Sequence, residues 1–149
     1  MKVYQHYING QFVAPHGATV FDVVNPATQE VIARVPEGSA ADIDAAVVAA
    51  RAAFESAAWR ETTAQERGRI LFRIADVVRR HAADLAELET INNGKPIVEA
   101  EMDIADVATC FEYYGGLATK IHGDVIPVPD NAMSLALREP IGVCGQIIP

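Results

Sequence analysis

The sequence has 149 residues, of which 50% are hydrophobic and 21% charged, a composition typical of a globular domain with its own core. Its net charge of −8, from 12 basic and 20 acidic residues, argues against binding to nucleic acid or to an anionic membrane surface. We see no signal peptide, no stretch apolar enough to cross a bilayer and only two cysteines, so we expect a cytoplasmic protein without disulfides.

The first third of the chain begins with β-strand patterns. Asn9-Gly10 lies between short apolar runs within residues 7–12, which predicts a hairpin because both turn positions need a positive φ. Residues 20–24 and 30–35 are two further strand candidates, and the turn-forming sequence Asn25 to Gln29 separates them.

Helical patterns follow. Ser39 with Asp42, and Thr63 with Glu66, have the spacing of helix-capping residues. Apolar residues recur at helical spacing after each cap, so we expect each helix to bury one face. The first face consists of Ile43, Val47, Ala50, Phe54 and Ala57, and the second of Ile70, Leu71, Ile74, Val77 and Val78, continued by Leu85, Leu88 and Ile91.

A helix end is predicted at residues 92–96, because Asn and Gly tolerate a left-handed cap and Pro96 can only open a new helix. The next helix should run from about Ile97 to Ala118 and partly bury Met102, Ala105, Val107, Phe111 and Tyr114. Gly115-Gly116 within it is best explained by close packing of its backbone against another element.

The last quarter returns to β-strand patterns. Residues 124–129 and 133–139 alternate around the turn Asp130-Asn131, which predicts an antiparallel hairpin whose prolines suit an edge strand. Residues 141–148 are almost entirely apolar, as in a strand buried on both faces of a parallel sheet. Such a strand needs neighbours on both edges and none follows, so we expect the sheet to be incomplete.

A search for catalytic patterns finds no complete constellation, and we assign no catalytic residue. The histidines lack metal-ligand spacing, and no nucleophile elbow or phosphate-binding glycine loop occurs. Cys110 and Cys144 lack neighbours that would activate a thiol, so we expect small buried hydrophobic residues. Glu99 and Asp103 share a helix face, which we interpret as a solvated acidic surface.

Several segments, in order and with similar gaps, resemble the NAD(P)-dependent aldehyde dehydrogenase superfamily over essentially the whole chain. They are Tyr7 to Val13, Asn25 to Ile32, Ala45 to Phe54 with Trp59-Arg60, Glu66 to Leu71, Glu89 to Pro96, Tyr113 to Gly116 with Lys120 to Gly123, and Arg138 to Pro149. The resemblance implies the α/β fold of that family, here only its N-terminal portion: β-hairpins, about three helices, an oligomerisation hairpin and the first strand of the Rossmann-like cofactor sheet.

The family oxidises aldehydes to carboxylic acids with NAD or NADP. A cysteine thiolate attacks the carbonyl, hydride passes to the nicotinamide, and a glutamate activates the water that releases the acid. By resemblance, the oxyanion-binding asparagine would follow directly after Pro149, and the nucleophile and base would lie further on. Neither Cys110 nor Cys144 matches the nucleophile's motif, so we expect the isolated chain to be inactive.

The resemblance also implies binding positions. Ile147, Ile148 and Pro149 would lie beside the dinucleotide, where ligands bind open α/β sheets. Many relatives bind a monovalent cation through a main-chain oxygen that matches Val24 and an acidic side chain that matches Asn92. Because Asn92 is neutral, this chain lacks the charge that the family uses at that position.

The resemblance predicts three regions: residues 1–123 as the N-terminal part of the cofactor-binding domain, 124–139 as a hairpin of the oligomerisation domain, and 140–149 as the start of the Rossmann-like sheet. The hairpin would extend a sheet across subunits, so we expect a homo-oligomer, a dimer or a tetramer.

Two alternatives remain open. The chain could be a standalone, non-catalytic module that associates with itself or with a dehydrogenase through its hairpin and open sheet edges. It could also be an unrelated helical binding domain, in which case residues 142–148 would be helical. The sequence leaves open which aldehyde is oxidised and which of NAD and NADP is used.

Overall fold

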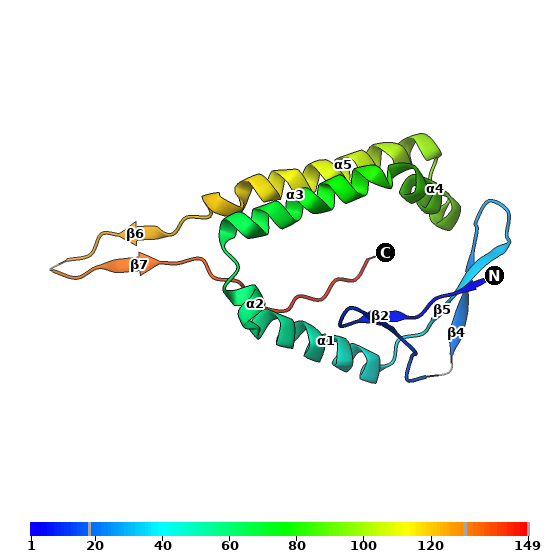
Figure 1. Cartoon of the computed structure of the whole chain (residues 1–149), viewed down its shortest axis with the longest axis horizontal. Helices are drawn as coiled ribbons and strands as arrows, with labels where there is room; N and C mark the ends of the chain where they lie inside the picture. The colour runs from blue at the N-terminus through cyan, green and yellow to red at the C-terminus, as the bar shows by residue number, and fades with distance from the viewer. Residues whose placement is uncertain (18, 130, 149) are drawn as a thin grey trace.

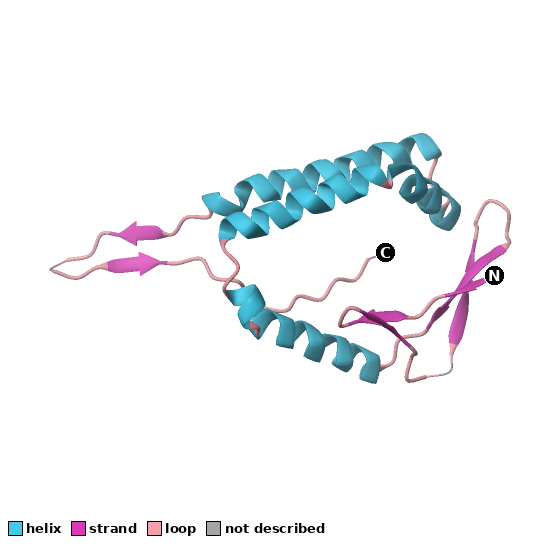
Figure 2. Cartoon of the chain, viewed as in Figure 1, coloured by secondary structure: helices cyan, strands magenta, loops and turns pink. Residues whose placement is uncertain are grey.

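The computed structural model describes residues 1–17, 19–129 and 131–148. The elements, in chain order, are β1 (Lys2–Val3), β2 (His6–Ile8), β3 (Gln11–Val13), β4 (Val20–Val24), β5 (Val31–Pro36), α1 (Ala40–Glu55), α2 (Ala57–Arg60), α3 (Ala64–Arg80), α4 (Ala82–Asn93), α5 (Ile97–Leu117), a 3₁₀ turn (Ala118–Lys120), β6 (Asp124–Ile126) and β7 (Ser134–Ala136). Small sheets at both ends of a helical frame confirm the partial α/β fold (Figures 1 and 2). Within the described ranges, no helix has the length and apolar character needed to span a bilayer.

The predicted N-terminal strands are confirmed. β2 and β3 form an antiparallel hairpin, and its turn residues Asn9 and Gly10 have φ values of 52° and 77°. β4 and β5 pair antiparallel, and the Asn25 carboxamide accepts a hydrogen bond of 2.9 Å from the backbone N–H of Ala27 in the turn between them. β1, which pairs parallel to β5, was not predicted, because two residues are too short to show a periodic pattern.

Both predicted helix starts are confirmed as capping boxes. The Ser39 hydroxyl accepts the backbone N–H of Asp42, and the Asp42 carboxylate accepts the backbone N–H of Ser39 in return. Thr63 and Glu66 make the same reciprocal pair at the start of α3.

The long helical stripe after Thr63 is divided, which gives the chain more helices than the expected three. α3 ends at Arg80, and the N–H of His81 is shared between the carbonyl groups of Val77 and Val78, at 3.2 Å each. The chain turns there, and α4 packs against α5 instead of continuing along the axis of α3 (Figure 1). α4 then ends as predicted, with Gly94 in the left-handed region at φ 84°.

α3 and α5 form an antiparallel pair whose backbones touch (Figure 1). A β-carbon placed on Gly68 would lie 2.7 Å from the carbonyl oxygen of Gly115, and one placed on Gly115 would lie 3.1 Å from the carbonyl oxygen of Gly68. Close packing was predicted for Gly115-Gly116; it is confirmed at Gly115 and is wrong at Gly116, where a β-carbon would meet nothing within 4 Å. Further along the pair, the Arg79 guanidinium donates two hydrogen bonds to the Glu112 carboxylate, at 2.5 and 2.7 Å.

The chain leaves most of its apolar surface in contact with solvent. Its accessible surface is 11537 Å², whereas a compact monomer of 16.0 kDa exposes roughly 7,400 Å². Among the described residues, the buried hydrophobic ones are all alanines, and no large side chain is fully buried. The frame is therefore held by contacts between helix pairs and not by a central core.

This exposure contradicts the expected burial of two helix faces. On α1, Ile43 is 61% exposed and Val47 46%; on α5, Met102 is 68% exposed and Tyr114 55%. The stripes have the predicted spacing, but no other element of the chain covers them.

The hairpin of β6 and β7 is confirmed, with Asp124 opposite Ala136 and Ile126 opposite Ser134. It projects from the helical frame (Figure 1). The strands are shorter than predicted, since Pro127 and Pro129 cannot donate to the ladder. Half of the predicted turn, Asp130, lies outside the described residues.

The buried strand expected at residues 141–148 is not formed. This segment has no regular secondary structure, and Ile141 and Ile147 are 95% and 99% exposed. A strand is defined by its pairing, and no strand edge of the described chain lies alongside this segment. The segment is not helical either, which removes the reading as an unrelated helical domain.

We predict that Gly68→Ala destabilises the α3–α5 pair by about 1–3 kcal/mol, because the added methyl group would press on the Gly115 backbone. Gly116→Ala is the matched control: a β-carbon there meets nothing within 4 Å, and alanine should favour the helix by up to about 1 kcal/mol. Urea unfolding followed by far-UV circular dichroism measures both. Equal effects of the two substitutions would contradict the close-packing account.

Candidate functional site

The segment predicted to border the cofactor, residues 140–148, lies against α1 and α2 through its first half. Pro140, Gly142, Val143 and Cys144 line one side of a hollow of about 670 Å³, and Phe54, Trp59 and Arg67 are among the residues opposite. Ile147 and Ile148 are 99% and 78% exposed, and Pro149 lies outside the described residues. The structure therefore builds a site from the residues before the predicted ones and leaves Ile147 and Ile148 in solvent.

The α1–α2 hollow brings together an aromatic ring, a guanidinium group and a thiol. The Arg67 guanidinium lies 5.7 Å from the centre of the Trp59 ring, and its Nε donates a hydrogen bond of 3.2 Å to the carbonyl oxygen of Thr62. The Cys144 thiol interacts with the carbonyl oxygen of Gly142 at 3.7 Å. Among the described residues, no carboxylate or imidazole lines the hollow.

Both cysteines differ from the expectation of burial. Cys110 on α5 and Cys144 after β7 are exposed. Their sequence surroundings are apolar, as the expectation assumed, but the neighbouring faces are uncovered. A cysteine with apolar neighbours in sequence is buried only where another element of the fold packs over it.

The two predicted cation positions lie on segments that touch. Pro26, two residues after Val24, approaches Gly94, two residues after Asn92: a β-carbon placed on Gly94 would lie 2.9 Å from Cγ of Pro26. Val24 ends β4 beside a register shift, and both Val24 and Asn92 are exposed. A carbonyl oxygen and a carboxamide oxygen are suitable donors for a hard cation, but neither carries a charge. In the described part of the chain, no group of three His, Cys, Asp or Glu residues could hold a metal ion.

A charged cluster at the start of α1 was missed in the sequence. The Asp42 carboxylate is buried, and it accepts hydrogen bonds from the Ser39 hydroxyl and N–H at 2.6 and 2.8 Å. It also accepts the His16 N–H at 3.1 Å, and the His16 Nδ1 lies 2.7 Å away. The buried Nε2 of His6 lies 3.8 Å from the carboxylate and has no hydrogen-bond partner.

This cluster ties the N-terminal hairpin and the loop after it to α1. The hydrogen bond from the Ser39 hydroxyl, followed by that from His16, holds the pKa of the Asp42 carboxyl far below its usual range. The spacing of Ser39 and Asp42 predicted the cap, but His16 is 26 residues from Asp42 and no sequence pattern connects them. The Asp42 cluster does not line the α1–α2 hollow.

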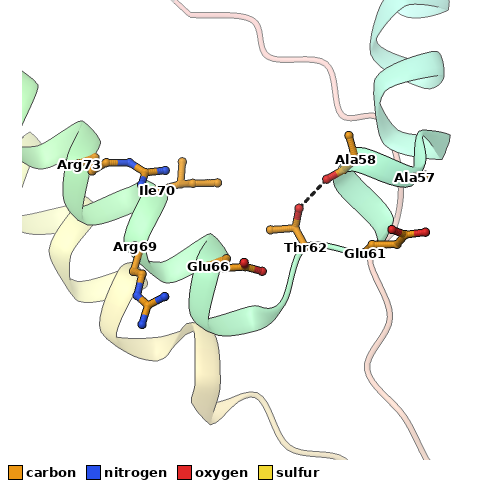
Figure 3. Close-up of a pocket in the computed structure, with 8 residues that line it drawn as sticks. All are labelled: Ala57, Ala58, Glu61, Thr62, Glu66, Arg69, Ile70 and Arg73. Carbon is orange, nitrogen blue, oxygen red and sulfur yellow. Dashed lines mark hydrogen bonds between the residues drawn. The ribbon is translucent and has the colours of Figure 1, made fainter.

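A second, polar hollow of about 500 Å³ lies where α2 meets α3 (Figure 3). Thr62 donates a hydrogen bond of 2.7 Å to the carbonyl oxygen of Ala58 at one side, and Arg69 and Arg73 extend from α3 at the other. The Glu66 carboxylate in this hollow accepts hydrogen bonds from the backbone N–H and the hydroxyl of Thr63. These bonds lower the pKa of Glu66, so the carboxylate stays ionised as part of the helix cap. A second carboxylate in this hollow belongs to Glu61, which is exposed directly after α2, so two carboxylates and two guanidinium groups line it.

Comparison with known proteins supplies what the geometry alone does not. The sequence model described as the aldehyde dehydrogenase family matches residues 12–149. Among curated proteins, an aldehyde dehydrogenase of Aspergillus niger is 46% identical over 143 residues, which is 96% of this chain and 29% of the relative. The chain spans less than a third of the length of the curated relatives that it matches.

Solved structures of aldehyde dehydrogenases have the same fold as this chain over most of its length. Betaine aldehyde dehydrogenase of Staphylococcus aureus, determined with NAD⁺, is 40% identical and superposes with a TM-score of 0.80 over 85% of this chain and 26% of its own. An NAD-dependent aldehyde dehydrogenase of Sinorhizobium meliloti is 34% identical, with a TM-score of 0.85 over 93% of this chain and 28% of its own.

We predict that Asp42→Asn destabilises the chain at pH 7, because the neutral amide loses the charge that these donors stabilise. A carboxyl group with a lowered folded-state pKa stabilises the fold above its unfolded pKa of about 3.9, and this contribution is lost as the pH falls further. The difference in urea midpoint between wild type and Asp42→Asn should therefore shrink as the pH falls from about 5 to about 3.

Asp44→Asn, on an exposed neighbour in the same helix turn, is the control and should have a small effect at every pH. A difference for Asp42→Asn that grows between pH 5 and 3 would contradict the assignment.

Proposed function

The chain belongs to the aldehyde dehydrogenase family, and we propose that it is part of an enzyme that oxidises an aldehyde to a carboxylic acid with NAD or NADP. The observation that carries the proposal is the family match from residue 12 to residue 149. The relatives, all dehydrogenases of aldehydes, and the NAD⁺-bound neighbour support the reaction type and the cofactor class.

In this proposal the chain contributes scaffold and binding surface, and no catalytic group. The described thiols of Cys110 and Cys144 have no imidazole or carboxylate hydrogen-bonded to them. A thiol nucleophile needs such activation. The nucleophile, the base and the oxyanion-binding amide would lie in the part of the family fold that this chain does not span.

The cofactor would approach the end of the segment that crosses the α1–α2 hollow. We infer that Ile147, Ile148 and Pro149 border the dinucleotide once the segment joins a parallel sheet. Ile147 and Ile148 are exposed and lie outside any strand, which supports this proposal. Their peptide groups can form the hydrogen bonds of a sheet with neighbouring strands, and a carbonyl oxygen can accept a hydrogen bond from a ribose hydroxyl.

We further propose that the β6–β7 hairpin contributes to a dimer or tetramer. It projects from the frame and exposes apolar side chains, Val125, Met133, Leu135 and Leu137 among them. The same proposal includes the division of the chain into residues 1–123 of the cofactor-binding domain, the hairpin at 124–139, and residues 140–149 at the start of the Rossmann-like sheet.

The alternative function, a standalone module that self-associates, fits the surface less well. The chain exposes roughly 4,000 Å² more than a compact monomer of its mass. A standard interface covers about 800 Å² per partner. A second copy docked on the hairpin would therefore leave most of the excess uncovered, whereas the remaining two thirds of a family fold could cover it.

We predict that the purified 149-residue chain does not reduce NAD⁺ or NADP⁺ in the presence of an aldehyde, and that the complete protein does. NADH or NADPH absorbance measures both. Aldehyde oxidation by the chain alone would contradict the placement of the chemistry elsewhere. A coding sequence that stops after Pro149 would favour the standalone module.

For the cation position we predict that Asn92→Asp increases stabilisation of the complete protein by K⁺ or Na⁺, because it places a carboxylate on the segment that touches the end of β4. Thermal unfolding with K⁺, Na⁺ or the bulky tetramethylammonium ion measures this. The gain should be specific to the small cations, and an equal response to all three would mean that only ionic strength had acted.

A further inference from the structure

α5 carries a groove that none of the sites above uses. One hollow of about 310 Å³ is lined by Leu71 of α3 and by Val107, Cys110, Phe111 and Tyr114 of α5. A second of about 500 Å³ is lined by Glu89, Asp103, Ile104, Asp106, Val107 and Cys110. The two hollows share Val107 and Cys110 and therefore lie next to each other along the helix; together we name them the α5 groove.

The residues that line the groove are spaced so that a helix can pack against them. Val107, Phe111 and Tyr114 follow one another at intervals of three or four residues and form a ridge along α5, beside the ridge of α3 that contains Leu71. The depression between two such ridges accepts the i, i+3, i+4 ridge of a third helix.

One end of the groove is acidic. Glu89, Asp103 and Asp106 bring three carboxylates there, and Lys95 is the ammonium that pairs with two of them, at 3.2 Å from Glu89 and 2.5 Å from Asp103. Three negative charges and one positive charge leave an excess of two. Asp106 has no ion-pair partner among the described residues.

We propose that the α5 groove is the seat of an amphipathic helix that belongs to the remainder of the same polypeptide and carries a lysine or arginine beside its apolar stripe. The apolar stripe of this helix would pack along the apolar part of the groove. Its lysine or arginine would pair with Asp106 at the acidic end. The source rests on the proposed function: the relatives are more than three times as long as this chain, and the excess surface exceeds what a second copy would cover.

The groove contains its own reporter, the exposed thiol of Cys110. Alkylation of Cys110 by iodoacetamide, followed by peptide mass spectrometry, should be on the order of tenfold or more slower in the complete protein than in the 149-residue chain, because the seated helix covers the sulfur. Equal rates in the two would overturn the proposal.

The cationic end of the helix is tested by charge reversal in the complete protein. Because Asp106→Lys also changes the charge one helical turn from the Cys110 thiol, each variant is compared with the same variant of the 149-residue chain. Asp106→Lys should accelerate alkylation of Cys110 more in the complete protein than in the 149-residue chain, and Asp106→Asn should do so more weakly. The control is Glu101→Lys, which reverses an exposed charge on α5 outside the groove and should change nothing. Protection of Cys110 that is insensitive to both Asp106 substitutions would overturn the proposed charge pairing, and circular dichroism confirms that each variant keeps its helices.

Aldehyde oxidation is measured on the same samples. An active complete protein whose Cys110 reacts freely overturns the groove proposal alone. A complete protein with a protected Cys110 and no aldehyde oxidation overturns the proposed function alone.

Discussion

The arrangement of the chain depends on the contact between the backbones of α3 and α5. Gly68 and Gly115 allow the two helices to pack backbone against backbone. A β-carbon on Gly68 would lie 2.7 Å from the carbonyl oxygen of Gly115, so any side chain at Gly68 would force the helices apart. That contact fixes the end of α5, and the hairpin of β6 and β7 leaves from there. The Arg79–Glu112 pair and the packing of α4 on α5 hold the rest of the helical pair in line. The N-terminal sheets are attached separately, through the Asp42 cluster and the contact between Pro26 and Gly94.

This frame buries little. Burial of apolar surface is the main favourable contribution to folding, and among the described residues the buried hydrophobic side chains are all alanines. Long apolar stripes on α1 and α5 and the second half of the segment after β7 remain in solvent. A surface of this kind resembles one half of a divided core more than the exterior of a finished protein. In the proposed function the chain therefore contributes scaffold, a projecting hairpin and grooves, and the reacting groups would lie in the part of the family fold that it does not span.

Predictions from the sequence succeeded where neighbouring residues decide the outcome. The Asn9-Gly10 turn, the two capping boxes and the left-handed Gly94 depend on local backbone preference, and all are confirmed. Predictions that needed a partner surface did not succeed. The stripe of Ile43 and Val47, the two thiols and the strand at residues 141–148 all required something to pack against or pair with. The link from His16 to Asp42 escaped notice because two segments far apart in sequence supply it. The cofactor positions Ile147, Ile148 and Pro149 and the cation positions Val24 and Asn92 remain predictions.

Amide hydrogen exchange on the 149-residue chain and on the complete protein tests the central claim most directly. If the exposed stripes are the inner face of a larger fold, the backbone of residues 141–148 and of α1 exchanges rapidly in the isolated chain and is strongly protected in the complete protein. The exposed turn at residues 25–30 should exchange at similar rates in both. Protection of residues 141–148 and α1 that is the same in the isolated chain and in the complete protein would contradict the account.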